Sequence, residues 1–347
     1  MPSIFVHVVT FNHQEFIEPC ISALLRQRSP RDDFSMQIVV SDNASTDNTL
    51  DCLARFTNEG VILRKSTDNL GFSGAHNWGV ARFLESSADL YVALNPDVAL
   101  EPMALHELVE GFGRWPDCGA ATGLLLRSDL QLRPLNPEVI DSAGMVFTNQ
   151  FRHFDRFAEC SPTRVVLREE KVEGATGAYF AVRRSFVERV ALDTGDNERV
   201  YQLYPALREG AAERYPLFDE SFFAYREDAE LSLRARMLGQ YFVFLPLSRG
   251  AHHRRVTPER RKSLSPEINK YGVRNRFLLQ ASLFSLTHHW RWVFGGLLLR
   301  NVVVFLGVIL LERQSIAAFR EFFVLLPRAL RRRRELLRKI NCSSYEF

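Results

Sequence analysis

Apolar runs alternate with segments of helical spacing over roughly the first hundred residues of the chain. Four strands are predicted by runs rich in β-branched residues: SIFVHVVTF, MQIVVSDNAST, GVILRKSTDNLG and DLYVALNPD. Three helices are predicted by the segments between them, EFIEPCISALLRQ, DNTLDCLARFTNE and SGAHNWGVARFLE, with Asp47 as the cap of the second. The alternation is typical of βαβ units and predicts an α/β fold with a doubly wound, mostly parallel sheet.

Polar side chains follow the end of each of these four strands. They are Thr10 and Asn12, then Asp42 to Asp47, then Asp68 to Asn77, and finally Asn95 to Asp97. Ligands of such sheets bind beyond the carboxyl ends of the strands. One such cluster is ordinary loop chemistry, but four at the same edge predict a shared site. The sequence has no GxGxxG after the first strand and no GxxxxGK[ST], which argues against dinucleotide and P-loop sites.

The stretch LNPDV, from Leu94 to Val98, ends the fourth strand, because proline cannot donate to a sheet ladder. The carboxylate of Asp97 therefore follows the C-terminal end of a buried strand. Two interpretations are open at this point. Asp97 takes part in chemistry, or it caps a helix that begins near Glu101.

Composition narrows the class of protein. The 347 residues, 46% of them hydrophobic, are enough for a sizeable core. The five cysteines are scattered without a CxxC pair, which predicts reduced thiols in a cytosolic protein. The N-terminus enters a strand at once, so no export signal is expected.

The C-terminal region is both apolar and basic. The stretch 293–311, VFGGLLLRNVVVFLGVILL, is about long enough to span a bilayer, but Arg300 near its middle costs roughly 2.5–3.5 kcal/mol on insertion. The next segment predicts a helix that ends in the basic run RALRRRRELLRK. One face of it carries Ile316, Phe319, Phe323, Leu326 and Leu330.

We expect this region to lie on an anionic membrane surface at the cytoplasmic face of the cell membrane, as a peripheral or monotopic segment. The alternatives are a true span and a helical pair packed on the catalytic domain or on a second subunit. Nucleic acid is not an expected partner, because no recognition aromatics are interleaved with the basic residues.

Two segments of the second half carry further candidates. VEGATGAYFAVRRSFVERV predicts a glycine-containing loop, a strand and a helix from Arg184 or Ser185. FDESFFAYREDAELSLRARMLG predicts aromatic residues followed by a helix whose first turn contains Glu227 and Asp228. The helix macrodipole favours anions there, so we expect it to keep the carboxylate ionised. The plain alternative is that both are ordinary first-turn acids.

Taken together, VVTFN, VVSDNASTDNT, NLGFSGAHNWG, LNPDV and FDESFFAYREDAELSLRARMLG resemble the family 2 inverting glycosyltransferases in order and spacing. The NPD form and a later YGVRNRF are most similar to the rhamnosyltransferase branch. The resemblance covers about residues 3–280. It implies a GT-A fold, a nucleotide-diphosphate-sugar donor, and a divalent metal, Mg²⁺ or Mn²⁺.

The resemblance also implies a role for individual residues. The implied donor-binding residues are Thr10, Asn12, Asp42, Asn43, Asp68, Asn69, Gly71, Gly74, Asn77, Asn95, Asp97 and Arg274. The implied acceptor-binding residues are Gly174, Gly177 and Tyr225. Asp228 would be the catalytic base that takes the acceptor proton, with Glu227 in support or as its substitute.

The implied metal ligands are Asp97 and His252, with His253 as the alternative histidine. Asn95 stands where the family's Asp-x-Asp motif begins with Asp, so we expect weaker metal binding. Arg254, Arg255 and the RKS beyond them would meet the diphosphate or an anionic acceptor.

These expectations combine into one prediction of function. Residues 1–280 would form a GT-A domain, with a nucleotide-sugar half (1–100) and an acceptor and base half (101–280). Residues 281–347 would be a helical, membrane-associating extension, and a homo-oligomer is compatible with it. The enzyme would move L-rhamnose from dTDP-rhamnose, with inversion, onto a hydroxyl of a lipid-linked or polymeric saccharide in cell-surface polysaccharide synthesis.

Three alternatives stay open. One is a transferase that uses another donor, such as UDP-galactofuranose or UDP-GlcNAc. The second is a nucleotidyltransferase, although the glycine- and lysine-rich N-terminal loop of that class is missing. The third is a non-catalytic subunit that binds nucleotide-sugar.

Overall fold

The computed structural model describes residues 1–30, 34–192, 197–208, 216–254, 265–285, 291 and 293–343. The strands are β1 (Ser3–Thr10), β2 (Ser35–Asp42), β3 (Ile62–Lys65), β4 (Leu90–Leu94), β5 (Val98–Leu100), β6 (Ala120–Arg127), β7 (Ile140–Ser142), β8 (Met145–Phe147), β9 (His153–Asp155), β10 (Glu170–Val172), β11 (Tyr179–Arg183) and β12 (Phe242–His252). The α-helices are α1 (Ile17–Leu25), α2 (Thr49–Ala54), α3 (Gly71–Glu85), α4 (Ala104–Arg114), α5 (Arg184–Val190), α6 (Glu198–Leu203), α7 (Glu227–Met237), α8 (Pro266–Leu283), α10 (Leu298–Leu311) and α11 (Ala317–Ser343).

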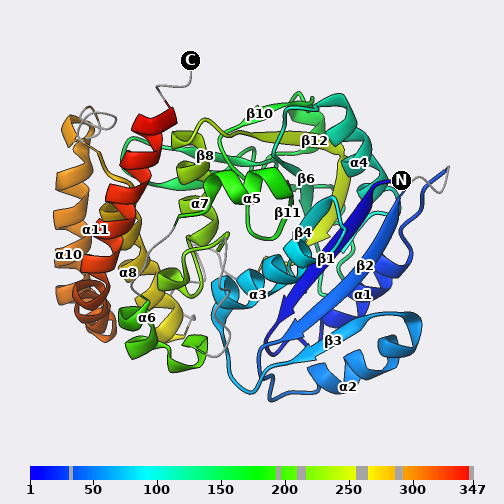
Figure 1. The fold of residues 1–347 in the computed structure, drawn as a ribbon, viewed down its shortest axis with the longest axis horizontal. Helices are drawn as coiled ribbons and strands as arrows, with labels where there is room; N and C mark the ends of the chain where they lie inside the picture. Colours follow the sequence, from blue (N-terminus) through cyan, green and yellow to red (C-terminus); the bar gives the residue numbers. More distant parts are fainter. Residues whose placement is uncertain are drawn as a thin grey trace.

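The described residues form a mixed 10-stranded sheet with the order β10-β12-β6-β11-β4-β1-β2-β3, to which β5 and β7 add at the side. Strands β4, β1, β2 and β3 are parallel, as the alternation of strands and helices predicts. β11 enters antiparallel between β4 and β6. The expected α/β class with a helical C-terminal segment is confirmed (Figure 1). Each antiparallel pair in the described residues includes a strand that follows β4 in the chain.

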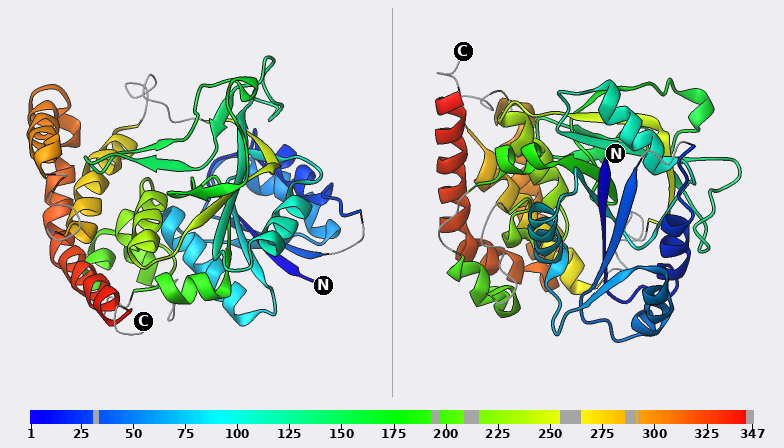
Figure 2. Two further views of the ribbon diagram at one scale, coloured as in Figure 1. Left: turned by 90° about the horizontal axis from the view of Figure 1, so that it is seen from above. Right: turned by 45° about the vertical axis from the view of Figure 1, so that its right-hand side comes forward.

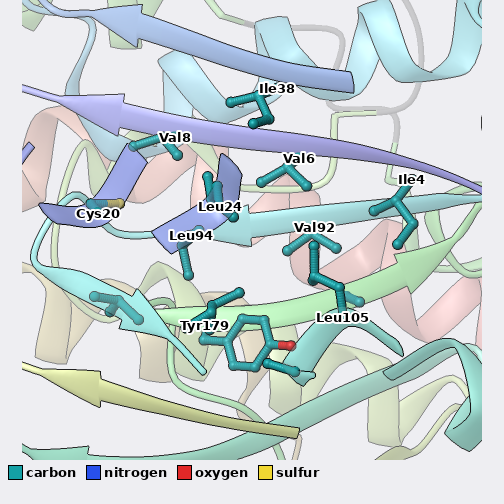
Figure 3. Packing of buried hydrophobic residues seen from close by; sticks show 14 of the residues in the cluster. Ile4, Val6, Val8, Cys20, Leu24, Ile38, Val92, Leu94, Leu105 and Tyr179 are labelled. Atoms are coloured by element: carbon teal, nitrogen blue, oxygen red, sulfur yellow. The ribbon is translucent and has the colours of Figure 1, made fainter. Parts of the chain in front are cut away.

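Period-two alternation along the central strands builds a core on each face of the sheet. On one face, Ile4, Val6 and Val8 of β1 pack with residues of α1, α4 and β4 (Figure 3). On the other face, Phe5 and Tyr91 pack against α3, α5 and α7. Because strand side chains point alternately to the two faces, one β-branched run serves both cores.

The turn after β4 shows that Asp97 does not cap a helix. β4 ends at Leu94, β5 begins at Val98, and α4 begins only at Ala104 with Met103 as its N-cap residue. Asp97 is therefore too far from the helix to cap it. Asp47, predicted as the cap of α2, lies one residue before the observed N-cap residue Asn48 and accepts a hydrogen bond from the backbone N–H of Thr49 at 3.0 Å.

The C-terminal helices share a core with the α/β body. α8, α10 and α11 lie side by side at one end of the molecule (Figures 1 and 2). Leu325, Ala329 and Leu336 of α11 are buried in the same cluster as Leu278 and Leu279 of α8. Apolar contacts between α11 and α8 thus cross the expected boundary near residue 280.

Two arginines of the basic segment are also buried in this contact. Arg332 is 2% exposed, and its Nε lies 2.8 Å from Asp219 Oδ2. Its Nη2 lies 3.3 Å from Glu230 Oε1, and Arg328 pairs with the other oxygen of Asp219. The basic run is therefore not a uniform lipid-facing cluster, because part of it neutralises acids inside the protein.

Helix α10 presents an apolar face to solvent. Its exposed apolar residues are Leu298, Leu299, Val302, Val303, Phe305, Leu306, Ile309, Leu310 and Leu311. The π-helical turn Val293–Leu297, with Gly296 at φ 90°, separates α10 from what precedes it. Within the described ranges, no helix alone has the length and hydropathy of a membrane span, and α10 with Arg313–Ile340 reaches them only as a pair bent by 115°.

Candidate active site

The carboxyl ends of β1 and β2 bring three predicted residues together. Thr10 pairs with Asp42 in the sheet register, and Asn43 N–H donates to the carbonyl of Thr10 at 2.8 Å. All three residues are buried. Thr10 Oγ1, Asp42 Oδ1 and Asn43 Oδ1 have no hydrogen-bond partner among the described residues. Buried polar atoms are normally satisfied, so three such atoms at one strand edge indicate a ligand-binding position.

The surrounding loops hold this edge in place. Asn12 Oδ1 accepts a hydrogen bond from Thr46 N–H at 2.8 Å and joins the loops after β1 and β2. Asn43 Nδ2 donates to the carbonyl of Gly71 at 3.0 Å and brings the start of α3 to the same edge. The side chain of Asn12 therefore holds the loops after β1 and β2 together through a hydrogen bond inside the protein.

Hydrogen bonds within the loop before α3 shape the start of that helix. Asn69 Oδ1 accepts from Gly71 N–H at 2.8 Å, and Asp68 accepts from Thr67. Gly71 has φ +67°, and a Cβ there would lie 2.5 Å from the carbonyl oxygen of Phe223. The glycine is needed because α3 approaches the loop before α7 this closely.

Several expected ligand residues are engaged inside the protein instead. Asn77 Nδ2 donates to the carbonyl of Phe218 and to Glu220 Oε1, and Asn77 Oδ1 accepts a hydrogen bond from Phe218 N–H. A Cβ on Gly74 would meet Leu207 at 2.3 Å, and one on Gly174 would meet Ser232 at 2.3 Å. Arg274 is fully buried and binds Glu321, Tyr204, Asn275 and the carbonyls of Ser221 and Phe222. These contacts show that Asn77, Gly74, Gly174 and Arg274 support the architecture of the site.

Asp97 and His252 face each other at the end of β12. His252 Nε2 lies 3.5 Å from Asp97 Oδ1, and His252 Nδ1 lies 2.7 Å from Asp141 Oδ2. Burial acts to lower the pKa of His252, but Asp141 and Asp97 outweigh it and raise the pKa to about 9. The alternative, His253, stacks on Phe16 with ring centroids 5.0 Å apart and lies against the carbonyl of Ser128. Of the two histidines, His252 is the one whose imidazole ring lies next to the Asp97 carboxylate.

Asp141 and Asp155 extend this pair into a charged network that sequence reasoning missed. Arg254 Nε lies 2.8 Å from Asp141 Oδ1, and Arg254 Nη1 lies 2.6 Å from Asp155 Oδ2. Burial acts to raise the pKa of Asp141, but His252 and Arg254 keep it below its usual value. Both aspartates lie in strands of three residues, β7 and β9, which carry no recognisable period in the sequence. Arg255 and 261–263 lie outside the described residues.

Glu227 and Asp228 begin α7, as predicted. Asp228 Oδ2 accepts from Gly177 N–H at 2.9 Å, and Oδ1 accepts from Ala229 N–H at 2.7 Å. Glu227 is buried, and its Oε2 has no hydrogen-bond partner within the part of the chain that the structure describes. Burial raises the pKa of Asp228 above its ordinary value despite these N–H contacts, and burial with the neighbouring Asp228 raises that of Glu227. We expected the helix terminus to favour the ionised form, but loss of solvation outweighs it.

The base candidate lies next to the turn that carries Asp97. Asn95 N–H donates to the carbonyl of Ala178 at 2.9 Å. The preceding residue, Gly177, donates its own N–H to Asp228. Two adjacent residues just before β11, Gly177 and Ala178, thus connect the two candidate groups. They lie beside the end of β4 because β11 runs antiparallel to it.

A strained loop leads into α7. Phe223, Tyr225 and Arg226 all have positive φ, at 62°, 70° and 70°. Such angles are costly for residues with a Cβ and persist only when surrounding contacts enforce them. Asn275 Nδ2 supplies those contacts, donating to the carbonyls of Phe222, Ala224 and Tyr225 at 2.8, 2.8 and 2.7 Å. α8 therefore fixes the direction in which Asp228 enters the site.

Comparison with known proteins places this geometry in context. A family model described as glycosyl transferase family 2 matches residues 5–190. No curated protein matches the chain. A crystal structure of GalNAc-T7 with UDP, GalNAc and Mn²⁺ matches at 13% identity and a TM-score of 0.57, over 82% of this chain and 48% of that one. A crystal structure of S. aureus TarS matches at 15% identity and a TM-score of 0.52, over 98% of this chain and 54% of that one. The chain spans about half the length of these two structures, and the likeness concerns the fold.

Proposed function

The chain belongs to glycosyl transferase family 2 and has a GT-A-like fold, and on this basis we propose that it is an inverting transferase with Asp228 as catalytic base. Asp228 would take the proton of an acceptor hydroxyl while that oxygen attacks the anomeric carbon of a nucleotide-diphosphate-sugar. The bond from the anomeric carbon to the diphosphate would break, and the nucleoside diphosphate would leave with the bonding electrons.

The observation that carries this proposal is the contact chain from Asn95 through Ala178 and Gly177 to Asp228, with two hydrogen bonds of 2.9 Å. It supports a base beside the turn that would hold the diphosphate. The unpartnered atoms of Thr10, Asp42 and Asn43 support a nucleoside site at the neighbouring strand ends. Hydrogen-bond donors of a base and a ribose are suitable partners for those oxygens.

We propose L-rhamnose as the sugar and dTDP-rhamnose as its donor, on the resemblance of NPD and YGVRNRF to the rhamnosyltransferase branch. The acceptor would be a hydroxyl of a lipid-linked or polymeric saccharide of the cell surface. Thermal shift with dTDP-, UDP- and GDP-sugars plus Mn²⁺ tests the donor. The largest stabilisation should come from dTDP-rhamnose, followed by detectable transfer. A larger shift with a UDP-sugar would overturn the rhamnose proposal, and donor binding without transfer would favour a non-catalytic subunit.

The residues present fit a divalent metal. Asp97 Oδ1 is buried without a hydrogen-bond partner among the described residues, and His252 Nε2 lies 3.5 Å from it. The contact of His252 Nδ1 with Asp141 orients the ring so that Nε2 faces Asp97, an arrangement common behind metal-binding histidines. The described residues contain no group of three or more His, Cys, Asp or Glu side chains that could hold a metal, so donor phosphates and water would supply the other ligands. When bound, the metal would neutralise charge on the leaving diphosphate.

Asp97→Ala should abolish metal-dependent donor binding, because Asn95 offers only a neutral oxygen. Asn95→Asp should tighten metal binding by restoring a second charge. Calorimetric titration of Mn²⁺, with and without donor, measures both. His253→Ala is the matched control and should leave metal binding unchanged. Full transfer activity in excess EDTA would exclude the metal site for Asp97 and His252 together.

We also propose that α10 attaches the protein peripherally or monotopically to the cytoplasmic face of the cell membrane. The support is its row of nine exposed apolar residues, next to exposed arginines such as Arg313 and Arg320. Apolar area plus basic charge is the combination that binds anionic interfaces.

Replacing Leu299, Val303 and Leu310 together with glutamine should remove binding to vesicles that contain phosphatidylglycerol, measured by co-sedimentation. The same change at Ile62, Val166 and Leu247, which are exposed on the α/β body, should leave binding intact. Wild-type protein should leave the vesicles in carbonate. Retention until detergent is added would show instead that the segment spans the bilayer.

A further inference from the structure

Strand β9 carries two polar side chains with buried atoms that the protein itself does not satisfy. His153 and Asp155 stand two positions apart, so their side chains leave the same face of the strand. Phe154 between them points to the opposite face and is 41% exposed. His153 Nδ1 and Asp155 Oδ1 are both buried without a hydrogen-bond partner among the residues that the structure describes. Buried polar atoms are normally satisfied, so two such atoms on one strand face indicate a position for a ligand.

An ion pair holds the end of β9 beside the turn that carries Asp97. Asp155 Oδ2 lies 2.6 Å from Arg254 Nη1. Arg254 directly follows His253, whose backbone N–H donates to the carbonyl of Asp97 at 3.0 Å. An ion pair and one backbone hydrogen bond thus connect β9 to the turn at which the diphosphate would be bound.

Strand β8 connects β9 to the proposed base. Met145 of β8 pairs with Asp155 in the antiparallel register, and its N–H donates to the carbonyl of Gly174 at 2.8 Å. Gly174 belongs to the loop before β11, in which Gly177 N–H donates to Asp228 Oδ2 at 2.9 Å. Burial raises the pKa of Asp228, and Asp155 adds to that rise. β9 is therefore linked to the base as well as to the proposed diphosphate turn.

The unpartnered atoms of β9 suit the hydroxyl groups of a sugar. A carboxylate oxygen accepts a hydrogen bond from a hydroxyl, and an imidazole nitrogen either accepts one from it or donates one to it. Residues i and i+2 of a strand are about 7 Å apart, so two hydroxyls of one sugar ring can reach both side chains. A phosphate is a poorer ligand here, because the carboxylate oxygen of Asp155 repels it. The chemistry of the pair thus selects an uncharged sugar ring.

The position of β9 favours the acceptor sugar over the donor. The unpartnered atoms that support a nucleoside site belong to Thr10, Asp42 and Asn43, at the ends of β1 and β2. β8 and β9 form a two-stranded sheet of their own and reach the base through the loop before β11. A catalytic base of this class contacts the acceptor hydroxyl that attacks. Groups beside the base are therefore placed to bind the sugar that carries this hydroxyl.

We propose that His153 Nδ1 and Asp155 Oδ1 bind two hydroxyl groups of the acceptor sugar, so that β9 determines which sugar is presented to Asp228. The inference rests on the proposed function, because the ligand is an acceptor only if the chain is a transferase. Arg254 would position the Asp155 carboxylate through their ion pair and leave Oδ1 for the ligand. A third hydroxyl of the same sugar would then lie at Asp228 and lose its proton to that carboxylate.

Transfer to octyl glycosides of L-rhamnose, D-galactose, D-glucose and N-acetyl-D-glucosamine tests the subsite. His153→Ala should raise the acceptor KM by roughly 3- to 10-fold, and Asp155→Asn by roughly 10- to 100-fold, because the second variant loses a hydrogen bond to a charged group. The donor KM and the rate of donor hydrolysis by water should stay at wild-type values, since neither depends on an acceptor sugar. Retained hydrolysis also shows that the variants are folded. Phe154→Ala, on the opposite face of β9, is the matched control and should leave the acceptor KM unchanged.

Deoxygenated acceptors separate a lost contact from a structural change. Each hydroxyl of the best octyl glycoside is replaced in turn by hydrogen, and kcat/KM is measured with the wild type and with His153→Ala. Removing the hydroxyl that His153 binds should cost the wild type roughly 3- to 10-fold and the variant less than about 2-fold. A variant that has only changed structure would lose as much as the wild type does at every position.

Three results would overturn the subsite. Equal losses for every deoxygenated acceptor in the wild type, His153→Ala and Asp155→Asn would show that neither side chain contacts the sugar. Donor hydrolysis without transfer to any of the glycosides would show that the chain binds no such acceptor, while the donor site and its chemistry stand. A chain that binds nucleotide-sugar but neither hydrolyses nor transfers it would refute the transferase proposal, and this inference with it.

Discussion

Replacing Asp228 with asparagine should lower turnover by about 10²–10⁴-fold, because the amide keeps the shape of the side chain but cannot accept a proton. The N–H groups of Gly177 and Ala229 still find an acceptor in the amide oxygen, so α7 should stay in place. Donor affinity should remain near that of the wild type. Single-turnover rates with saturating donor, together with donor titrations, measure the two quantities separately.

Glu227→Gln is the matched control for this prediction. It removes a neighbouring carboxyl without removing the proposed base, so we expect a much smaller loss of turnover. Since burial raises the pKa of Asp228, the rate should rise with pH through a value above the ordinary aspartate pKa of about 3.9. More than a tenth of wild-type turnover in Asp228→Asn would transfer the role of base to Glu227.

Asp219→Ala should lower the free energy of unfolding by roughly 3–5 kcal/mol, the usual cost of leaving buried charges without their partner. Asp219 is 1% exposed and pairs with both Arg328 and Arg332. The substitution leaves both arginines inside the contact between α11 and the α/β body, with Glu230 as the remaining acid near Arg332. Urea unfolding followed by circular dichroism measures the loss.

Glu198→Ala breaks a comparable pair, with Arg208, in which both side chains are at least 60% exposed. Exposed pairs contribute little, so its unfolding midpoint should stay at the wild-type value. The buried pairs of Asp219 connect α11 to the α/β body. We therefore propose that the described residues unfold as one cooperative unit, and that the boundary expected near residue 280 is not a domain boundary. A separate early transition for α10 and α11, unaffected by Asp219→Ala, would contradict this.

The first half of the fold follows from local pattern. The apolar runs and helical spacing of residues 3–100 are strong because parallel strands buried on both faces select apolar residues at most positions. The acids at the start of α7 were visible for a similar reason, since Glu227 and Asp228 stand directly after an aromatic segment and before a periodic one. These features depend on neighbours in sequence.

The parts that sequence reasoning missed depend on partners far along the chain. Asn77 bonds to residues 141 and 143 positions away, and His252 meets Asp141 across 111 positions. Arg328 and Arg332 look like surface charges in an arginine run, and only the tertiary structure brings Asp219 to them. A polar residue near a motif can therefore serve the ligand or the scaffold, and spacing alone does not distinguish the two.

The single amide of Asn275 has a consequence for how this protein can diversify. The two N–H groups of this amide donate to three carbonyl oxygens of the loop before α7. Both donors of the amide are therefore in use, and the three carbonyl positions are fixed relative to one another. Surface loops near active sites ordinarily change specificity by gaining or losing residues. One inserted residue here would break several of these contacts at once and displace Asp228. Descendants of this chain should therefore acquire new acceptors by exchanging side chains such as Tyr225, while the length of the segment stays constant.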